Sequence, residues 1–131
     1  MIRVMLVDDH QLIRSCFREV LGREAGLEIV AEAGNGEEAI NLVRLHRPDV
    51  ILMDVSMPGI GGLEATRRIG QSFPETRIIA LTRYGDDPFP ARLLEAGAAG
   101  YITKGSDIEE VISAIKSVHD GTEYITQEIA Q

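Results

Sequence analysis

The sequence has 131 residues, of which 44% are hydrophobic and 26% charged, a composition typical of one soluble globular domain. Acidic residues outnumber basic ones by 21 to 13, so the formal net charge of -8 disfavours direct nucleic-acid binding and favours a bound cation. No apolar run approaches the roughly 20 residues of a membrane span, and the single cysteine, Cys16, cannot form a disulfide within the chain. We therefore expect a cytoplasmic protein that does not enter a membrane.

The first structural unit is an apolar run followed by an amphipathic segment. The run covers 2–7, and the apolar positions of the next segment, from Leu12 to Leu21, mark one face of a helix. Cys16 lies on that apolar face. The pattern predicts that Cys16 is buried and acts as a small hydrophobe, not as a reactive thiol.

Four more pairs of a strand and a helix follow. The strands are predicted at 27–31, 50–53, 78–81 and 100–103, and the helices near 36–46, 62–72, 88–97 and 106–119. Ser106, with Glu109 three residues later, is the predicted N-cap of the last helix. The longest irregular stretches, 56–62 and 83–90, are predicted to be loops of the same domain.

Strands that alternate with helices indicate a parallel sheet, and the almost continuous apolar runs at 50–53 and 78–81 indicate that helices cover both faces of it. Right-handed crossovers between five strands make the flavodoxin-like order 2-1-3-4-5 the simplest topology. The sequence therefore predicts an α/β fold, a doubly wound five-stranded parallel sheet with five helices. Its ligand site is expected beyond the carboxyl ends of the first and third strands.

Charged or hydroxyl side chains follow four of the predicted strands. Asp8 and Asp9 follow the first strand, and Asp54, Thr82 and Lys104 mark the ends of the third, fourth and fifth. Because the first and third strands are neighbours, three carboxylates and one ammonium group converge at one edge of the sheet. Such carboxylates repel one another unless a divalent cation neutralises them, and oxygen ligands point to Mg²⁺. The acidic pair also disfavours a bare flavin phosphate at this edge.

The same residues are suited to phosphoryl transfer. With the metal ion held by the acidic pair, Asp54 can act as a nucleophile toward phosphorus and form an acyl phosphate. Lys104 would neutralise one phosphoryl oxygen as a point charge, and the Thr82 hydroxyl would donate to another. Phosphoryl transfer requires mainly positioning and charge neutralisation, which this set provides.

Four motifs follow one another along the chain: Val-Asp-Asp-His at 7–10, Leu-Met-Asp-Val-Ser-Met-Pro-Gly at 52–59, Ala-Leu-Thr at 80–82 and Ala-Gly-Ala-Ala-Gly-Tyr-Ile-Thr-Lys at 96–104. In this order and spacing they resemble the receiver domain of two-component response regulators, over essentially the whole chain. Val-Asp-Asp-His, the Met-Pro-Gly-Ile-Gly-Gly-Leu-Glu-Ala-Thr stretch at 57–66 and Asp-Pro-Phe-Pro at 87–90 look more narrowly like the NarL/FixJ class and its GacA/UvrY branch.

The resemblance implies a role for each acidic residue of the site. Asp54 would be the phosphoacceptor. Asp9, Asp54 and the carbonyl of Ser56 would hold Mg²⁺, and Asp8 would act on the ion through water.

The resemblance also implies a phosphate-binding residue and a switch. Lys104 would bind the phosphoryl group, and Thr82 and Tyr101 would form the switch pair. The sequence departs from the family pattern at Gly105, where many receivers have a cis-proline after the lysine, so the geometry of this loop is left open.

As a receiver, the chain would accept a phosphoryl group from a sensor histidine kinase or a phosphotransfer domain, and it would be a signalling domain with slow self-dephosphorylation, not an enzyme. Residues 1–120 would form this domain, and 121–131 would be a tail or the start of a linker to a helix-turn-helix DNA-binding domain that this chain lacks. Phosphorylation would promote a homodimer or free that domain. DNA would then be bound only through it.

Two other functions remain open from the residues. A Mg²⁺-dependent phosphatase with an aspartate nucleophile has a similar sheet, but such enzymes place an acid two residues after the nucleophile, where this chain has Ser56. A scaffold without chemistry would lack a specific Mg²⁺ site. We interpret His10 as a solvated or hydrogen-bonded histidine, and not as a metal ligand.

Overall fold

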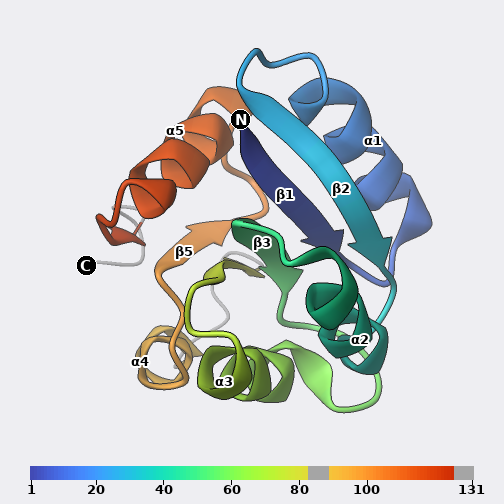
Figure 1. Cartoon of the computed structure of the whole chain (residues 1–131), viewed down its shortest axis with the longest axis vertical. Coiled ribbons are helices and arrows are strands. Elements are labelled where there is room, and N and C mark those ends of the chain that lie inside the picture. Colours follow the sequence, from blue (N-terminus) through green and yellow to red (C-terminus); the bar gives the residue numbers. More distant parts are fainter. Residues whose placement is uncertain (83–88, 126–131) are drawn as a thin grey trace.

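The computed structural model describes residues 1–82 and 89–125, in which strands alternate with helices (Figure 1). In chain order the elements are β1 (Ile2–Val7), α1 (Gln11–Leu21), β2 (Leu27–Ala33), α2 (Gly36–His46), β3 (Val50–Asp54), α3 (Gly61–Ser72), β4 (Arg77–Thr82), α4 (Phe89–Glu95), β5 (Gly100–Thr103), α5 (Ile108–His119) and β6 (Tyr124–Ile125). Every predicted element is present. The predicted loop at 83–90 falls largely outside the described residues.

The described strands form one parallel sheet in the order β2-β1-β3-β4-β5-β6. This arrangement confirms the predicted order of the first five strands and adds a sixth. Tyr124 and Ile125 of β6 pair with Gly100 and Tyr101 of β5, within the segment that the sequence indicates as a tail or linker. A strand of two residues is too short to produce a recognisable alternation in the sequence.

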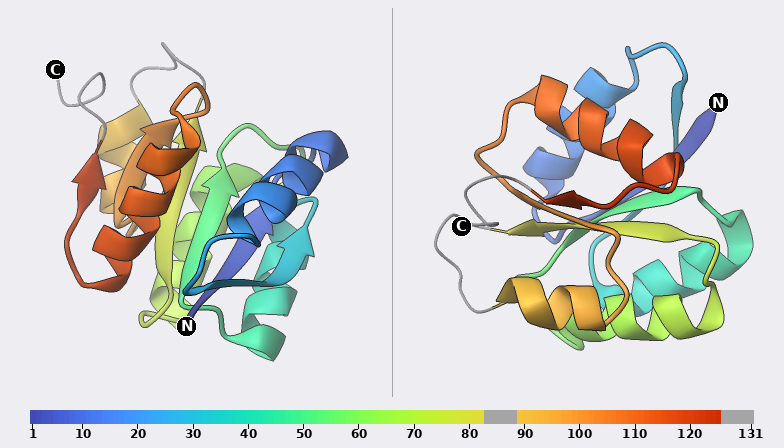
Figure 2. Two further views of the ribbon diagram at one scale, coloured as in Figure 1. Left: turned by 90° about the horizontal axis from the view of Figure 1, so that it is seen from above. Right: turned by 90° about the vertical axis from the view of Figure 1, so that its left-hand side faces the viewer.

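Helices cover both faces of the sheet (Figure 2). Successive residues of β1 point to opposite faces: Val4 and Leu6 pack with α1 and α5, and Met5 and Val7 pack with α2 and α3. Leu93 of α4 packs on the part of the second face that β4 and β5 form. All five residues of β3 are buried, because this central strand has helices on both sides. No helix in the described ranges 1–82 and 89–125 is long and apolar enough to span a membrane.

The α5 helix begins one position later than its predicted cap implies. Its N-cap is Asp107, whose side chain accepts a hydrogen bond from the backbone N–H of Glu110 at 2.9 Å. The hydroxyl of Ser106 lies instead 3.3 Å from that of Thr103. The predicted cap was wrong because Asp107 and Glu110 have the same spacing as Ser106 and Glu109, and aspartate caps a helix as well as serine does.

The predicted burial of Cys16 is wrong, because its side chain is exposed. Of the α1 residues only Leu21 is buried, and Leu12 is 77% exposed. The apolar stripe of this helix is therefore wider than the surface that the sheet and α5 cover. The uncovered part is an apolar groove lined by Leu12, Ile13, Cys16, Phe17 and Val20 of α1 and by Ser106, Ile108 and Val111.

Gly62, in the first turn of α3, allows the helix to start against the end of β3. A Cβ atom there would overlap the backbone carbonyl oxygen of Asp54 and lie 2.5 Å from Cα of Val55. We expect Gly62→Ala to lower the free energy of unfolding by about 1–3 kcal/mol, measured by urea denaturation, because the backbone must shift to admit the methyl group. Gly105→Ala is the matched control, since nothing lies within 4 Å of its Cβ position. Equal stability of the two variants would contradict this account.

Candidate functional site

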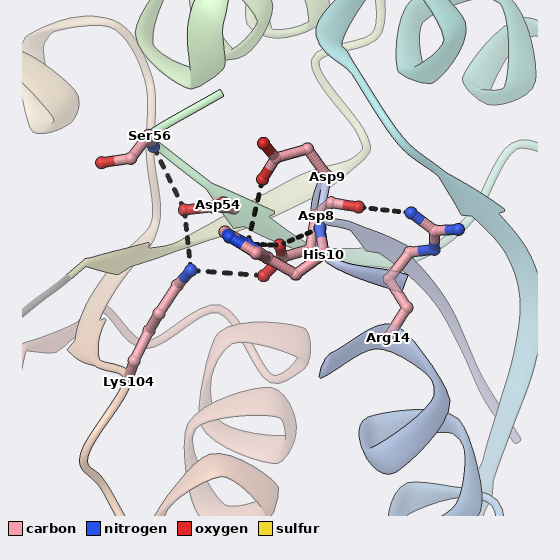
Figure 3. A network of polar contacts seen from close by, with 7 residues as sticks. All are labelled: Asp8, Asp9, His10, Arg14, Asp54, Ser56 and Lys104. Atoms are coloured by element: carbon pink, nitrogen blue, oxygen red, sulfur yellow. Dashed lines mark hydrogen bonds and ion pairs between the residues drawn. The ribbon is translucent and has the colours of Figure 1, made fainter. Parts of the chain in front are cut away.

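The register of the sheet brings residues from four strand ends to one edge. Val7 of β1 pairs with Met53 of β3, so Asp8 and Asp54 occupy the next positions on adjacent strands. Thr82 of β4 pairs with Thr103 of β5, and the backbone N–H of Lys104 donates to the carbonyl oxygen of Thr82 at 2.7 Å. The edge therefore carries the side chains that the sequence predicts to converge (Figure 3).

Asp54 is buried at the centre of this edge, with 1% of its surface exposed. Its Oδ1 atom accepts a hydrogen bond from the backbone N–H of Ser56 at 3.1 Å and lies 3.2 Å from Nζ of Lys104. Its Oδ2 atom is buried and has no hydrogen-bond partner among the described residues. A buried carboxylate oxygen without a partner is costly, so a ligand of this edge would have to satisfy it.

The two oxygens of Asp8 face different groups. Oδ1 accepts the backbone N–H of His10 at 2.9 Å and lies 2.9 Å from Nδ1 of the same histidine, and Oδ2 lies 3.3 Å from Nζ of Lys104. His10 Nδ1 is also 3.1 Å from Oδ1 of Asp9. Arg14 of α1 fixes the turn, since its Nη1 donates to the backbone carbonyl of Asp8 at 2.5 Å.

The two buried carboxyl groups are shifted in opposite directions. Burial raises the pKa of Asp54 above its ordinary value, and the charge of Asp8 raises it further, while the Ser56 N–H and Lys104 offset only part of the effect. Burial also acts to raise the pKa of Asp8, but the hydrogen bonds from His10 and the charge of Lys104 outweigh it and hold this pKa below its ordinary value. The same ammonium group therefore lies beside two acids whose pKa values are shifted in opposite directions.

The edge fits a divalent cation. Asp8, Asp9, His10 and Asp54 each offer one ligand atom, and these atoms all lie within 4.8 Å of one another. Three carboxylates face one ammonium group, so the cluster carries excess negative charge when the acids are ionised. The buried Oδ2 of Asp54, which has no hydrogen-bond partner among the described residues, is an independent observation that this edge needs a ligand.

The structure also places the remaining predicted residues. Ser56, directly after β3, is in hydrogen-bond contact with Asp54 through its backbone, as described above. Thr82 is 1% exposed at the end of β4. Tyr101 is 1% exposed and packs in a cluster with Ala80, Leu93 and Ala98.

His10 is the one residue of this cluster that the sequence interpretation left outside it. The only signal for it was its position directly after the acidic pair. That position makes it the N-cap of α1, with extended backbone angles that turn the chain back over the strand end. The turn brings the ring to both Asp8 and Asp9.

Comparison with protein families assigns the chain with this fold and this cluster of acids to a known family. Residues 4–116 match the family of the response regulator receiver domain. The chain belongs to this family, so it is a signalling receiver domain of the two-component type. Proteins of this domain type pair with histidine kinases.

Similar proteins place the chain near one branch of this family and confirm its resemblance to GacA and UvrY. The chain is 51% identical over all 131 residues to the response regulator GacA of Pseudomonas viridiflava and to the response regulator UvrY of Escherichia coli K12, of which it covers 61% and 60%. It thus spans about six-tenths of the length of these relatives. A LuxR-family response regulator from Aurantimonas sp. SI85-9A1 has 42% identity and a TM-score of 0.93, over 98% of this chain and 92% of that one.

The raised pKa of Asp54 predicts a pH-dependent effect on stability. The unfolded chain releases this proton at lower pH than the folded protein does, so ionisation of Asp54 opposes folding above its folded pKa. Near pH 7 and without divalent cations, we expect Asp54→Asn to unfold at a higher denaturant concentration than the wild type. The gain should shrink as the pH falls below that pKa.

Asp120→Asn is the control for this experiment, because Asp120 is exposed at the end of α5, away from the cluster. It should leave the midpoint of unfolding within experimental error of the wild type. A wild-type protein that is more stable than Asp54→Asn throughout the neutral range would contradict the assigned direction.

Proposed function

We propose that the chain accepts a phosphoryl group on Asp54 from a sensor histidine kinase or a phosphotransfer domain, in a reaction that depends on Mg²⁺. The observation that carries this proposal is the state of the Asp54 carboxylate. One of its oxygens is held by Lys104 and Ser56, and the other is buried without a partner, beside Asp8. Membership of the receiver family supports the same role.

Asp54 is the only acid of the cluster that fits the role of nucleophile. It lies within β3, the strand that helices cover on both faces, so its position is rigid. Asp9 is exposed in the turn after β1, and Asp8 is engaged by His10 and Lys104. The raised pKa of Asp54 also gives its carboxylate the greater basicity of the two buried acids.

We assign the metal ligands to Asp9, Asp54 and the backbone carbonyl of Ser56, with Asp8 acting through water. When bound, Mg²⁺ would neutralise the acids and the charge that develops on the phosphoryl group. Burial at this edge limits the water that can screen these charges. The electrostatic interactions between the ion, the acids and the phosphoryl group would therefore be stronger than in water.

Lys104 and Thr82 would bind the transferred group. The ammonium group of Lys104 already lies within 3.3 Å of both buried acids. It can therefore form an ion pair with an oxygen of a phosphoryl group on Asp54 with little movement. Thr82 ends β4, the strand that pairs with β3. Its hydroxyl is the candidate donor to a second oxygen.

Thr82 and Tyr101 would carry the signal from the phosphate. A phosphoryl group adds about -1.5 to -2 charge and draws the hydroxyl toward it. Tyr101 packs against Leu93 of α4, so a change at the end of β4 is transmitted through buried contacts to the α4, β5 and α5 surface. We place the output of the switch on that surface.

At the level of the whole protein, we propose a cytoplasmic regulator of transcription. Residues 1–120 would be the receiver, and 121–131 would lead toward a helix-turn-helix domain that alone would contact DNA. Phosphorylation would favour a homodimer or release that domain. The alignment with only six-tenths of GacA and UvrY is consistent with a further domain.

Phosphorylation tests the proposal directly. Incubation with Mg²⁺ and a small acyl-phosphate donor should add one phosphoryl group to the chain, seen by intact mass, and Asp54→Asn should add none. Asp9→Asn should need about 10- to 100-fold more Mg²⁺, since a ligand is lost. Asp120→Asn should behave as the wild type. Labelling that persists in Asp54→Asn would disprove the assignment.

A hydrolytic enzyme is the second candidate function, and Ser56 argues against it. The residue two positions after the nucleophile bears a hydroxyl instead of an acid, so the leaving group and the acyl phosphate lack a positioned proton donor. We expect slow self-dephosphorylation and no sustained phosphate release from phosphomonoesters. Steady multiple turnover in a phosphate-release assay would favour the phosphatase.

A further inference from the structure

We propose that His10 is a ligand of the metal site. Its imidazole nitrogen would raise the affinity of the site for divalent cations that favour nitrogen ligands, such as Ni²⁺, relative to its affinity for Mg²⁺. The inference rests on the metal site of the proposed function and names a second class of cation for it. His10 is the only described residue of the cluster that offers nitrogen as a ligand atom.

The distances around His10 fit adjacent positions of an octahedral ion. Bonds of about 2.1 Å at right angles place neighbouring ligand atoms about 3.0 Å apart. His10 Nδ1 lies 2.9 Å from Oδ1 of Asp8 and 3.1 Å from Oδ1 of Asp9. Nδ1 of His10 and Oδ1 of Asp9 can therefore share one cation with only small movements of the side chains, while Asp8 acts on the ion through water as in the proposed function.

Lys104 does not occupy the space beside His10 where the cation would bind. Its ammonium group lies 3.3 Å from Oδ2 of Asp8 and 3.2 Å from Oδ1 of Asp54, whereas Nδ1 of His10 faces Oδ1 of Asp8 and Oδ1 of Asp9 (Figure 3). The lysine thus neutralises one side of the acids and the histidine borders the other. A cation beside His10 does not have to displace Lys104.

Two further features make the ring available. The His10 side chain is 48% exposed, so an ion can reach Nδ1 from solvent. The buried, unpaired Oδ2 of Asp54 lies in the same cluster and provides a ligand that water-exposed acids lack. Metal binding requires a neutral imidazole with its proton on Nε2, which solvent can hydrogen-bond.

Ligand chemistry separates the two classes of cation. Mg²⁺ prefers oxygen and keeps several waters, so loss of an imidazole affects it little. Affinity for nitrogen ligands rises along the divalent series toward Ni²⁺ and Cu²⁺. A histidine that ligates should therefore alter the ratio of Ni²⁺ to Mg²⁺ affinity, and a histidine that only orients the acids should alter both affinities together.

The experiment compares Ni²⁺ and Mg²⁺ affinity by isothermal titration calorimetry in the wild type and in His10→Gln. All proteins carry Cys16→Ser and no affinity tag, because Cys16 is an exposed thiol that binds soft metals. His119→Gln is the matched control, since His119 is also partly exposed but lies at the end of α5. Circular dichroism checks the fold of each variant, and His10→Asn serves as a second substitution.

We expect His10→Gln to weaken Ni²⁺ binding at least about tenfold and to change Mg²⁺ binding less than twofold, with His119→Gln unchanged. The visible absorption bands of bound Ni²⁺ should also move to longer wavelength, because oxygen replaces nitrogen. Unchanged Ni²⁺ affinity and unchanged bands overturn the proposal. An equal loss for both ions also overturns it, since His10 then acts only by positioning the acids.

The same titrations separate this inference from the proposed function. A wild-type protein that fails to bind Mg²⁺ contradicts the proposed Mg²⁺-dependent phosphorylation. The Ni²⁺ comparison between the wild type and His10→Gln still decides the role of His10 in that case.

Discussion

The site depends on the close approach of two buried acids, Asp8 and Asp54, that share one ammonium group. The sheet register places them at neighbouring strand ends, and Lys104 reaches both, within 3.3 Å. One positive charge does not balance the acidic cluster, and the low exposure of both acids leaves little water to screen them. Burial, and after it repulsion from Asp8, raises the pKa of Asp54. In the proposed function, metal binding and nucleophilicity would thus have one physical origin.

The core provides the rigidity that this arrangement needs. Because helices pack on both faces of β3, Asp54 cannot relax away from Asp8 without disturbing buried residues on two sides. Asp9 and His10, in the turn after β1, are exposed and can adjust. In the proposed function, a fixed Asp54 and adjustable groups in this turn would suit a reaction in which a partner delivers the phosphoryl group.

Much of this could be predicted from the sequence, because the signals are local and strong. The apolar runs at 2–7 and 100–103 have the bounds of β1 and β5, and the parallel order follows from the alternation with helices. The convergence of the acids and Lys104 follows from that order. Features that depend on packing could not be predicted: the exposure of Cys16 reflects how little of α1 the sheet covers, and the His10 contacts depend on the turn after β1.

The short strand β6 sets the direction of the backbone at Ile125. Since β6 runs parallel to β5, the backbone at Ile125 heads toward the edge of the sheet that holds Asp54 and not toward the opposite edge. Any segment joined after Ile125 would start from the edge that holds Asp54, beside the strand that carries Tyr101; in the proposed function this edge would also receive the phosphoryl group. Input and output would then compete for space around one rim of the molecule, and occupancy of that rim by one partner would restrict access by the other.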